Sequence, residues 1–281
     1  MLEVPRVKRL YDMEPVIRVE NVVKRRTARG LGRRSSDFTA VDSVSFSILP
    51  GNTLALVGES GSGKSSLALC LACLEQVTAG QIWFEGRDLA ALEEEELRAV
   101  RPRLQMVFQD PANSLNPRWT VGEIVAEPLF VQGRISKRER GARAARALEQ
   151  VGLAAEYLPR SPRELSGGQR QRVAIARALI LEPKLLILDE VLSALDCSIQ
   201  AQIANLLVEL QRLYGMTYLF ITHDLRMVAH LADEIAVMSG GKIVEHGVAE
   251  EILRSPRHAY TRSLLGARPL VPETMGAVRK R

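Results

Sequence analysis

The amino-acid sequence predicts an α/β fold with a largely parallel β-sheet. Short apolar runs of the kind found in buried strands occur at 53–57, 104–108, 185–188 and 217–222. Stretches with helical periodicity lie between them, and strands that alternate with helices of this length usually form crossover units whose strands run parallel. At 281 residues the chain is long enough for one or two domains with a sizeable core.

The N-terminal part predicts two half-buried strands. Residues 1–15 show little pattern and read as a tail, whereas 16–22 and 41–48 alternate apolar and polar residues, as such strands do. The segment 24–37 between them is rich in Arg, Gly and Ser. We expect it to be an exposed loop whose charges are solvated; the alternative is a contact with nucleic acid.

Helices are expected to follow the strands. The first apolar strand leads through a glycine-rich turn into a helix at 64–74. The stretch 110–162 is mostly helical with no comparable strand, so we expect a helical insertion beside the sheet. Beyond residue 233 come two strand-like runs divided by a Gly-Gly pair, a helix at 249–253 and a basic tail. Further helices are predicted at 137–151, 168–181 and 198–213.

The composition favours a globular chain that does not itself cross a membrane. Hydrophobic residues make up 46% and charged residues 25%, ordinary values for a globular protein. The chain has no run of about 18 apolar residues, and its N-terminus lacks the apolar stretch of a secretory signal. The net charge of +5 permits contact with anionic lipid or nucleic acid but requires neither.

The cysteines are expected to be packed side chains rather than disulfide partners or metal ligands. Cys70, Cys73 and Cys197 give no disulfide framework and fit a reducing cytosol. Cys70 and Cys73 are spaced as C-x-x-C, but they lie on a predicted apolar helix. We therefore expect them to be core residues rather than metal ligands.

A glycine-rich loop after the strand at 53–57 matches the pattern G-x-x-x-x-G-K-[S/T] in full. Its glycines let backbone N–H groups approach phosphate oxygens, and the helix N-terminus behind them favours an anion. Lys64 can reach the β- and γ-phosphates, and the Ser65 hydroxyl can ligate Mg²⁺. The loop predicts a nucleoside triphosphate site, against the alternative of a Gly/Ser turn without a ligand. Its residues are Gly58, Glu59, Ser60, Gly61, Ser62, Gly63, Lys64, Ser65 and Ser66.

Three other strands end in polar side chains. Asp189 and Glu190 follow the strand at 185–188, and paired acids rarely end a buried strand without a counter-ion. We expect Asp189 to hold the Mg²⁺ shell and Glu190 to polarise an attacking water as a general base; the alternative is two solvated acids. His223 follows the strand at 217–222, and the ends of parallel strands meet at one edge, so it is expected beside the γ-phosphate. Gln109 follows the strand at 104–108, where its position alone does not distinguish it from a surface glutamine.

The segment LSGGQRQR at 165–172 identifies the family. It places a Ser and two Gly before a predicted helix, which makes a second anion-binding N-terminus. LSGGQ resembles the signature motif of the ABC ATPases and lies between the phosphate loop and the acidic strand, as it does in that family. With Gln109 as the Q-loop glutamine, 193–196 as the D-loop and His223 as the H-loop, the chain from about residue 16 onward resembles a complete ABC nucleotide-binding domain.

The resemblance implies a fold, a domain plan and ligands. The fold is a P-loop NTPase with a RecA-like core, an antiparallel β subdomain and a helical subdomain at about 110–165. The ATP-binding domain would span 16–255 and be followed by an extension at 256–281. ATP and Mg²⁺ are the implied ligands, with Ser65, Gln109 and Asp189 serving the metal. The implied catalytic residues are Glu190, His223 and Gln109.

The resemblance also implies a partner ATPase subunit. Two such domains pair head to tail, and each ATP lies between one phosphate loop and the signature of the other domain. ATP binding closes the pair, and hydrolysis lets it open. The residues that would bind the partner's ATP are Ser166, Gly167, Gly168 and Gln169.

Two segments narrow the resemblance. MVFQDP at 106–111 with SLNPR at 114–118, and SPRHAYTR at 255–262, are similar to segments of the peptide/nickel importer ATPases, of the second-ATPase type. This implies two permeases, an extracytoplasmic solute-binding protein, and a peripheral position on the cytoplasmic face of the inner membrane, without nucleic acid. ATPase subunits touch permeases rather than the transported solute, so the sequence does not decide between peptide, nickel, opine and glutathione. It also does not decide whether the two ATPase subunits form a homodimer or a heterodimer.

Several positions depart from the family, including Val191 and Leu192 after the acidic pair, and a rival function stays open. Arg25 and Arg26 stand where the family usually has an aromatic residue that stacks on adenine. A guanidinium or the ring of Phe38 could take that place. The rival function is a soluble ABC ATPase in translation or DNA repair, although most of those carry two fused cassettes or a long coiled-coil insertion.

Overall fold

Six strands form the central sheet of the computed structural model, which describes residues 13–28, 36–109, 114–133, 135–193 and 195–266. Their order is β10-β9-β3-β8-β7-β6. All neighbours pair in parallel except β10 and β9, which form an antiparallel hairpin. Strands β3, β7 and β8 are buried along their whole length, and strands buried on both faces read as continuous apolar runs, which is why the sequence revealed these three. Their bounds are β3 (Thr53–Val57), β6 (Leu104–Val107), β7 (Leu185–Asp189), β8 (Thr217–Thr222), β9 (Glu234–Ser239) and β10 (Lys242–Val248).

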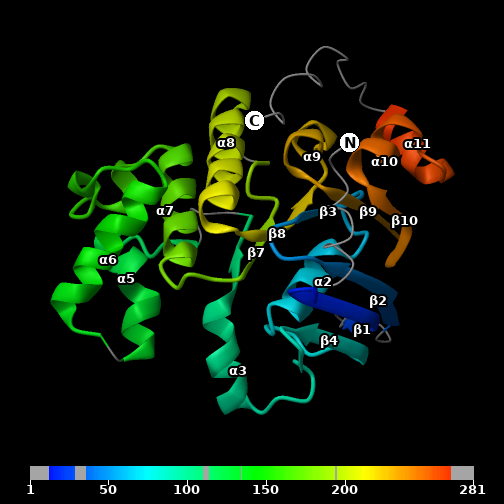
Figure 1. Ribbon diagram of the computed structural model, residues 1–281, viewed down its shortest axis with the longest axis horizontal. Coiled ribbons are helices and arrows are strands. Elements are labelled where there is room, and N and C mark those ends of the chain that lie inside the picture. Colours follow the sequence, from blue (N-terminus) through cyan, green and yellow to red (C-terminus); the bar gives the residue numbers. More distant parts are fainter. Residues whose placement is uncertain (1–12, 29–35, 110–113, 134, 194, 267–281) are drawn as a thin grey trace, which may run out of the picture.

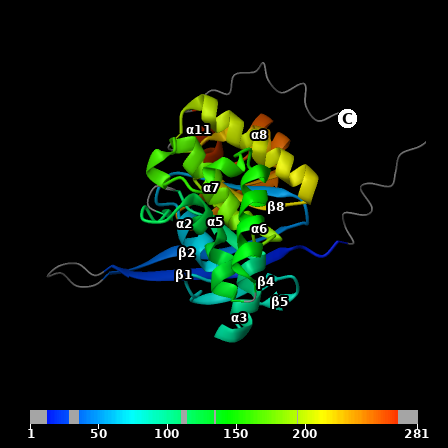
Figure 2. The ribbon, with the colours of Figure 1, turned by 90° about the vertical axis from the view of Figure 1, so that its left-hand side faces the viewer.

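A second, antiparallel sheet has the order β2-β1-β4-β5. Its inward residues share one core with β3 and α2, where Ile17, Leu54 and Leu67 are almost completely buried. The paired strands β1 and β2 extend beyond the rest of the sheet on one side (Figure 2). Their bounds are β1 (Ile17–Ala28), β2 (Ser36–Ile48), β4 (Ala79–Phe84) and β5 (Arg87–Asp88).

The hairpin of β1 and β2 corrects the expected loop at 24–37. Strand β1 continues to Ala28 and β2 begins at Ser36, with Lys24 opposite Val41 and Ala28 opposite Ser36. The charges of Lys24 and Arg26 are paired with Glu75 rather than solvated. Cross-strand pairing and this carboxylate outweigh the loop-like composition. The remaining positions, 29–35, lie outside the described residues.

A helical layer covers one side of the central sheet. Helices α5, α6 and α7 pack on one another, and α7 also contacts β6. Figure 1 shows this layer apart from the antiparallel sheet, with the central sheet between them, and Figure 2 views the molecule from the helical side. Their bounds are α5 (Val121–Gln132), α6 (Lys137–Gln150) and α7 (Gly167–Leu179), with short 3-10 turns at Ala155–Tyr157 and Pro162–Glu164.

The other helices flank the sheets. Helix α2 begins directly after the glycine-rich loop, and α8 begins after the acidic end of β7. None of the described helices is long and apolar enough to cross a membrane. Their bounds are α2 (Lys64–Leu71), α3 (Glu94–Val100), α8 (Cys197–Tyr214), α9 (Leu225–Leu231), α10 (Ala249–Arg254) and α11 (Ala259–Gly266), with a 3-10 turn at Arg101–Arg103.

Candidate nucleotide site

The glycine-rich loop joins β3 to α2: Gly58 to Gly63 form the loop, and the predicted residues Lys64 to Ser66 lie in the first turn of α2. Gly63 has a φ of 107°, and a Cβ on it would lie 2.1 Å from the Ala40 carbonyl oxygen. Only glycine can take that conformation so close to β2. The loop is thereby pressed against the antiparallel sheet, and the N-terminus of α2 is left for an anion.

Lys64 is buried under the loop, with 4% of the residue exposed. Its Nζ donates to the carbonyl oxygens of Gly58 and Glu59, both at 2.8 Å. Burial lowers the pKa of Lys64, whereas Glu190 and Asp189 act in the opposite direction. The loop carbonyls therefore hold a cation at the position where phosphate oxygens would arrive.

Asp189 ends β7 next to this helix. Its Oδ1 lies 3.4 Å from the Ser65 Oγ, which joins the phosphate loop to the acidic strand. Burial raises the pKa of Asp189, and the charge of Glu190 adds to that effect. A hydroxyl and a carboxylate at one place are the hard oxygen ligands that Mg²⁺ prefers, and a cation here would offset the cost of the buried charge.

Glu190 is the point on which the predicted catalytic residues converge. The Gln109 Nε2 donates to its Oε2 at 3.1 Å, and the His223 Nδ1 lies 3.4 Å from the same oxygen. Glu190 has a φ of 48°, which is unusual for a residue with a side chain. The structure therefore brings together Gln109, Glu190 and His223 from the ends of β6, β7 and β8.

The signature residues lie in a different part of the molecule. Ser166 caps α7: its Oγ accepts the N–H of Gln169, and its own N–H donates to the Gln169 side chain. A Cβ on Gly168 would lie 2.5 Å from the Ile199 Cγ2, so a larger residue would collide with α8. Ser166 and Gly167 are exposed, and α7 lies well apart from α2 (Figure 1). The signature is thus not assembled with the phosphate loop of its own chain.

The region after Gln109 is only partly described. Positions 110–113, which continue the predicted Q-loop, and Ala194 of the predicted D-loop lie outside the described residues. Within the D-loop, the Ser193 Oγ donates to the Glu190 carbonyl at 2.9 Å, and Asp196 caps α8 through the N–H of Ile199. The first bond ties Ser193 back to the acidic pair, and the second fixes the start of α8.

The candidates for contact with adenine differ in whether their side chains are already engaged by other residues. The Arg26 Nη2 is paired with Glu75 Oε1 at 2.6 Å. Phe38 stands opposite Arg26 on β2 and is 51% exposed. Two residues along the same strand, Ala40 touches the phosphate loop at Gly63. Phe38 is therefore the aromatic ring that β2 places beside the loop.

The cysteines of the C-x-x-C spacing pack in the core between α2 and the sheets. Cys70 is 3% exposed, and burial raises its pKa to about 11. Burial also raises the pKa of Cys73. Both thiols therefore stay protonated near neutral pH and behave as small apolar side chains, as the sequence predicts.

Two contacts of the phosphate loop were missed by sequence reasoning. The Gly241 N–H donates to the Ser62 carbonyl at 3.0 Å, and the Tyr260 hydroxyl accepts the N–H of Glu59 at 3.0 Å. Both partners come from the C-terminal quarter of the chain, and no local spacing signals such a contact. In the sequence, Tyr260 stood out only because the segment 255–262 resembles a segment of the peptide/nickel importer ATPases.

Comparison with known proteins identifies the family. A family model described as ABC transporter matches residues 41–193, more than half of the chain. The chain belongs to the ABC transporter family. It is 48% identical over 265 residues, 94% of its length, to the glutathione import ATP-binding protein GsiA of Escherichia coli (strain K12). It spans 42% of that protein, so the relative carries sequence that this chain does not match.

Solved structures of ABC ATPases share the fold. A dimeric post-hydrolysis state of the ATP-binding cassette MJ0796 bound to ADP and Pi has a TM-score of 0.73 at 30% identity, covering 83% of this chain and 98% of that one. The cbiO1 protein from Clostridium perfringens, part of an ABC transporter complex, gives a TM-score of 0.73 at 27% identity, covering 91% and 96%. The predicted fold class, with its RecA-like core, antiparallel β subdomain and helical subdomain, is confirmed.

The predicted resemblance to ATP-binding subunits of the peptide/nickel importer type is also confirmed. The names of GsiA and of the cbiO1 structure refer to transport, and neither refers to translation or DNA repair.

Proposed function

We propose that this chain hydrolyses ATP to power solute import and that Glu190 polarises the attacking water. The observation that carries the proposal is the convergence on one carboxylate oxygen: Gln109 at 3.1 Å and His223 at 3.4 Å from Glu190 Oε2. Two polar side chains from neighbouring strand ends would hold the carboxylate in one orientation. A fixed carboxylate at the edge where the phosphates lie is what a general base requires.

The chemistry is an in-line displacement at the γ-phosphorus. Glu190 orients the water and takes its proton as the oxygen–phosphorus bond forms, and the bond to the bridging oxygen of ADP breaks. Lys64 and the N–H groups at the start of α2 stabilise the charge on the phosphate oxygens. His223 contacts the γ-phosphate and keeps Glu190 in register. In this scheme Glu190 and His223 are the catalytic residues, with Gln109 positioning the carboxylate.

The residues that fit Mg²⁺ are Ser65, Asp189 and Gln109. Their hydroxyl, carboxylate and amide oxygens are ligands of the class that Mg²⁺ takes in nucleotide sites. The Ser65–Asp189 contact and the raised pKa of the buried Asp189 both support a cation there. When bound, the ion supplies neutralisation of charge on the β- and γ-phosphate oxygens.

A second cassette would complete the site. Ser166, Gly167 and Gln169 are at least partly exposed at the N-terminus of α7, so they can face another molecule. The relative MJ0796 is a dimer in its ADP-bound structure. This supports head-to-tail pairing, in which the signature of one chain binds the ATP held by Lys64 of the other.

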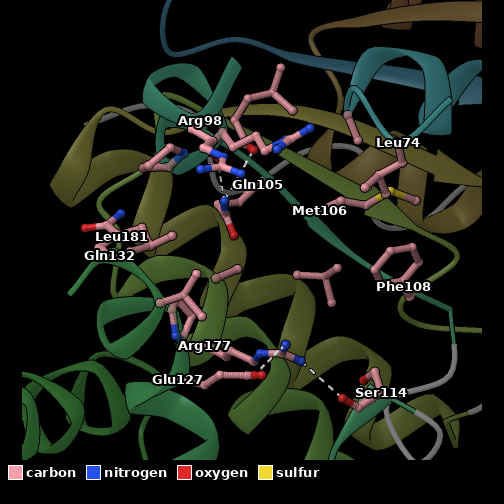
Figure 3. A pocket seen from close by; sticks show the side chains of 18 of the residues that line it. Leu74, Arg98, Gln105, Met106, Phe108, Ser114, Glu127, Gln132, Arg177 and Leu181 are labelled. Carbon is pink, nitrogen blue, oxygen red and sulfur yellow. Dashed lines mark hydrogen bonds and ion pairs between the residues drawn. The ribbon is translucent and has the colours of Figure 1, made fainter. Parts of the chain in front are cut away.

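A permease would dock in the cleft between the central sheet and the helical layer. This cleft has a volume of about 1320 Å³ and includes residues of α3, β6, α5 and α7 (Figure 3). Leu74, Phe108 and Val131 line it and are 54%, 43% and 78% exposed. Charged side chains such as Glu127 and Arg177 line it as well, and a groove that combines apolar and charged residues fits a short amphipathic helix of a membrane subunit. Docking there would hold the chain on the cytoplasmic face of the inner membrane, peripherally.

The solute class proposed for the transporter is small peptides, with nickel- and opine-like solutes as the alternative. The relatives are named for import of glutathione, a tripeptide, which favours peptides. An extracytoplasmic binding protein would deliver the solute to the permeases. Ligand binding by that protein decides the solute.

Replacing Glu190 tests the function. Glu190→Gln keeps the size of the side chain and removes its basicity, so ATP turnover by the assembled transporter should fall by at least about 100-fold. ATP affinity should stay close to that of the wild type, because the phosphates are bound by the loop. Phosphate release and nucleotide binding are the two measurements.

The matched control is Glu209→Gln, an exposed glutamate on α8 that contacts none of the nucleotide-site residues described above. It should leave both measurements unchanged. Turnover at the wild-type rate in the Glu190→Gln transporter would refute the role of Glu190. Loss of ATP binding in that variant would place the residue in binding instead.

A further inference from the structure

The phosphate loop has a hydrogen-bond partner far along the chain. The Tyr260 hydroxyl accepts the N–H of Glu59 at 3.0 Å, across 201 positions of sequence. Tyr260 belongs to the first turn of α11, and Glu59 is the second residue of the loop. A helix near the C-terminal end of the described chain therefore contacts the nucleotide site directly.

The peptide group that Tyr260 contacts is also the one that holds Lys64. The N–H of Glu59 and the C=O of Gly58 belong to one peptide plane. That carbonyl accepts the Lys64 Nζ at 2.8 Å. Hydrogen bonds at the two ends of one amide polarise it in the same direction and strengthen each other. The tyrosine hydroxyl thus helps to fix the carbonyl that orients the lysine.

The same peptide group is confined on its other side. A Cβ on Gly58 would lie 2.1 Å from the Met238 carbonyl oxygen, so the first residue of the loop is in close contact with β9. The Gly58–Glu59 peptide is therefore held between β9 and α11. A group held on two sides and bonded at both ends has little freedom to turn, which keeps the loop ready for phosphate.

Tyr260 is held in place by contacts that do not involve the loop. The Glu245 carboxylate of β10 accepts the N–H groups of Arg257 and His258 at 2.7 and 3.1 Å, which fixes the start of the segment. The Tyr260 N–H donates to His258 Nδ1 at 3.2 Å. The tyrosine also packs against the core cluster that includes Val57, the last residue of β3. Because these contacts hold Tyr260 independently of the phosphate loop, the tyrosine can fix the position of the loop.

We propose that Tyr260 is a positioning residue of the nucleotide site, acting through the Gly58–Glu59 peptide on Lys64. The proposal rests on the proposed role of the phosphate loop in ATP binding. It makes the segment 255–262 part of the site, beyond the loop and strand ends. Without the hydroxyl, the peptide can rotate, and Lys64 loses one fixed acceptor.

The test is the ATP affinity of the full chain with single hydroxyl changes. Tyr260→Phe removes only the hydroxyl, and we expect ATP and ADP to bind roughly three- to ten-fold more weakly, the effect of one hydrogen bond. Tyr214→Phe, at an exposed tyrosine of α8, is the matched control and should bind as the wild type does. Lys64→Ala is measured alongside and should bind ATP far more weakly than either. The unfolding temperature without nucleotide should be the same for Tyr260→Phe and Tyr214→Phe.

The outcomes separate the two levels of the proposal. If Lys64→Ala loses ATP and Tyr260→Phe binds as the wild type does, the role of Tyr260 is refuted while the site stands. If Lys64→Ala itself binds normally, the site is refuted. A drop in affinity matched by an equal loss of folded protein would mean that Tyr260 only packs, which also refutes the proposal.

A second variant tests the same link through the anchor. Glu245→Ala removes the acceptor of Arg257 and His258 and leaves Tyr260 intact, so it should weaken ATP binding in the same direction. Adding Tyr260→Phe to it should cause a smaller further loss than Tyr260→Phe causes alone, because the two act through one contact. Fully additive losses would contradict the proposal.

Discussion

Glu190 and Asp189 are adjacent in sequence, yet their side chains serve different neighbours. Asp189 is the last residue of β7 and faces Ser65, whereas Glu190 faces Gln109 and His223. The left-handed backbone of Glu190, with a φ of 48°, turns the chain away from the sheet at that residue. Such a conformation costs roughly 1 kcal/mol or more and persists where the surroundings fix it. Here it aims the two carboxylates at two sets of partners.

Adenine recognition gives a prediction at the same scale. Phe38→Ala should weaken ATP binding by roughly two- to ten-fold, the effect of one aromatic stacking contact, with little change in stability because the ring is 51% exposed. The Arg25→Ala, Arg26→Ala double variant should bind ATP nearly as the wild type does, because Arg26 is engaged by Glu75. ATP titration of each purified variant is the measurement.

Phe130→Ala is the control for that experiment, since Phe130 is 65% exposed and stacks with Arg140 in the helical layer. It should leave ATP affinity unchanged. Normal affinity in Phe38→Ala together with a large loss in the arginine variant would reverse the assignment and place a guanidinium on the base.

At the scale of elements, the sequence predicted those parts whose signal is local. The buried strands β3 and β8 have the predicted bounds because their apolar runs lie between clear turn residues. Strand β4 was missed, since Ala79–Phe84 contains a glycine and is only partly buried. Helix α3 was missed because its acidic sequence has no apolar face long enough to show a period. In the site, motif spacing found Lys64 and Glu190, but no spacing could link Glu59 to Tyr260, because the link exists only in the folded chain.

The docking of α11 should depend on pH through Glu245. Burial alone would raise the pKa of Glu245, but the Thr261 side chain and the N–H groups of Arg257 and His258 act on the carboxylate and hold its pKa below the ordinary value. Because its pKa is lowered in the folded chain, the carboxylate contributes its whole stabilisation of the docked segment at pH values above the ordinary pKa of about 4.3. This stabilisation is lost as the pH falls through the lowered pKa. Hydrogen exchange of peptides covering 255–266, corrected for the intrinsic rate, should therefore increase on acidification below about pH 4.5.

Glu245→Gln supplies the comparison for that experiment, because an amide does not titrate in this range. Its exchange in 255–266 should be faster at neutral pH, by roughly ten-fold, and nearly independent of acidification. Peptides of α8 serve as an internal reference for global unfolding. Equal acid sensitivity in the wild type and Glu245→Gln would exclude the carboxylate as the cause.

At the scale of the whole molecule, the two halves of an ATP site are carried by different layers. The phosphate loop and the polar strand ends lie at the central sheet, whereas the signature begins α7 in the helical layer (Figure 1). Contacts of α7 with α5, α6 and β6 fix that layer against the sheet. A chain built in this way presents one half site on each layer, and the cleft for the proposed permease lies between the same two layers.

Self-association in the presence of ATP follows from that division. We expect the Glu190→Gln chain, which retains uncleaved ATP, to sediment as a dimer with Mg²⁺-ATP and as a monomer with Mg²⁺-ADP. Adding Ser166→Glu should keep it monomeric with ATP bound, because the exposed Ser166 would then place a carboxylate against the γ-phosphate held by the partner chain. A matched change at another exposed helix N-cap, Ser136→Glu at the start of α6, should dimerise normally. If the Glu190→Gln chain binds ATP and stays monomeric, the chain does not pair with itself, and its second half site belongs to a different cassette.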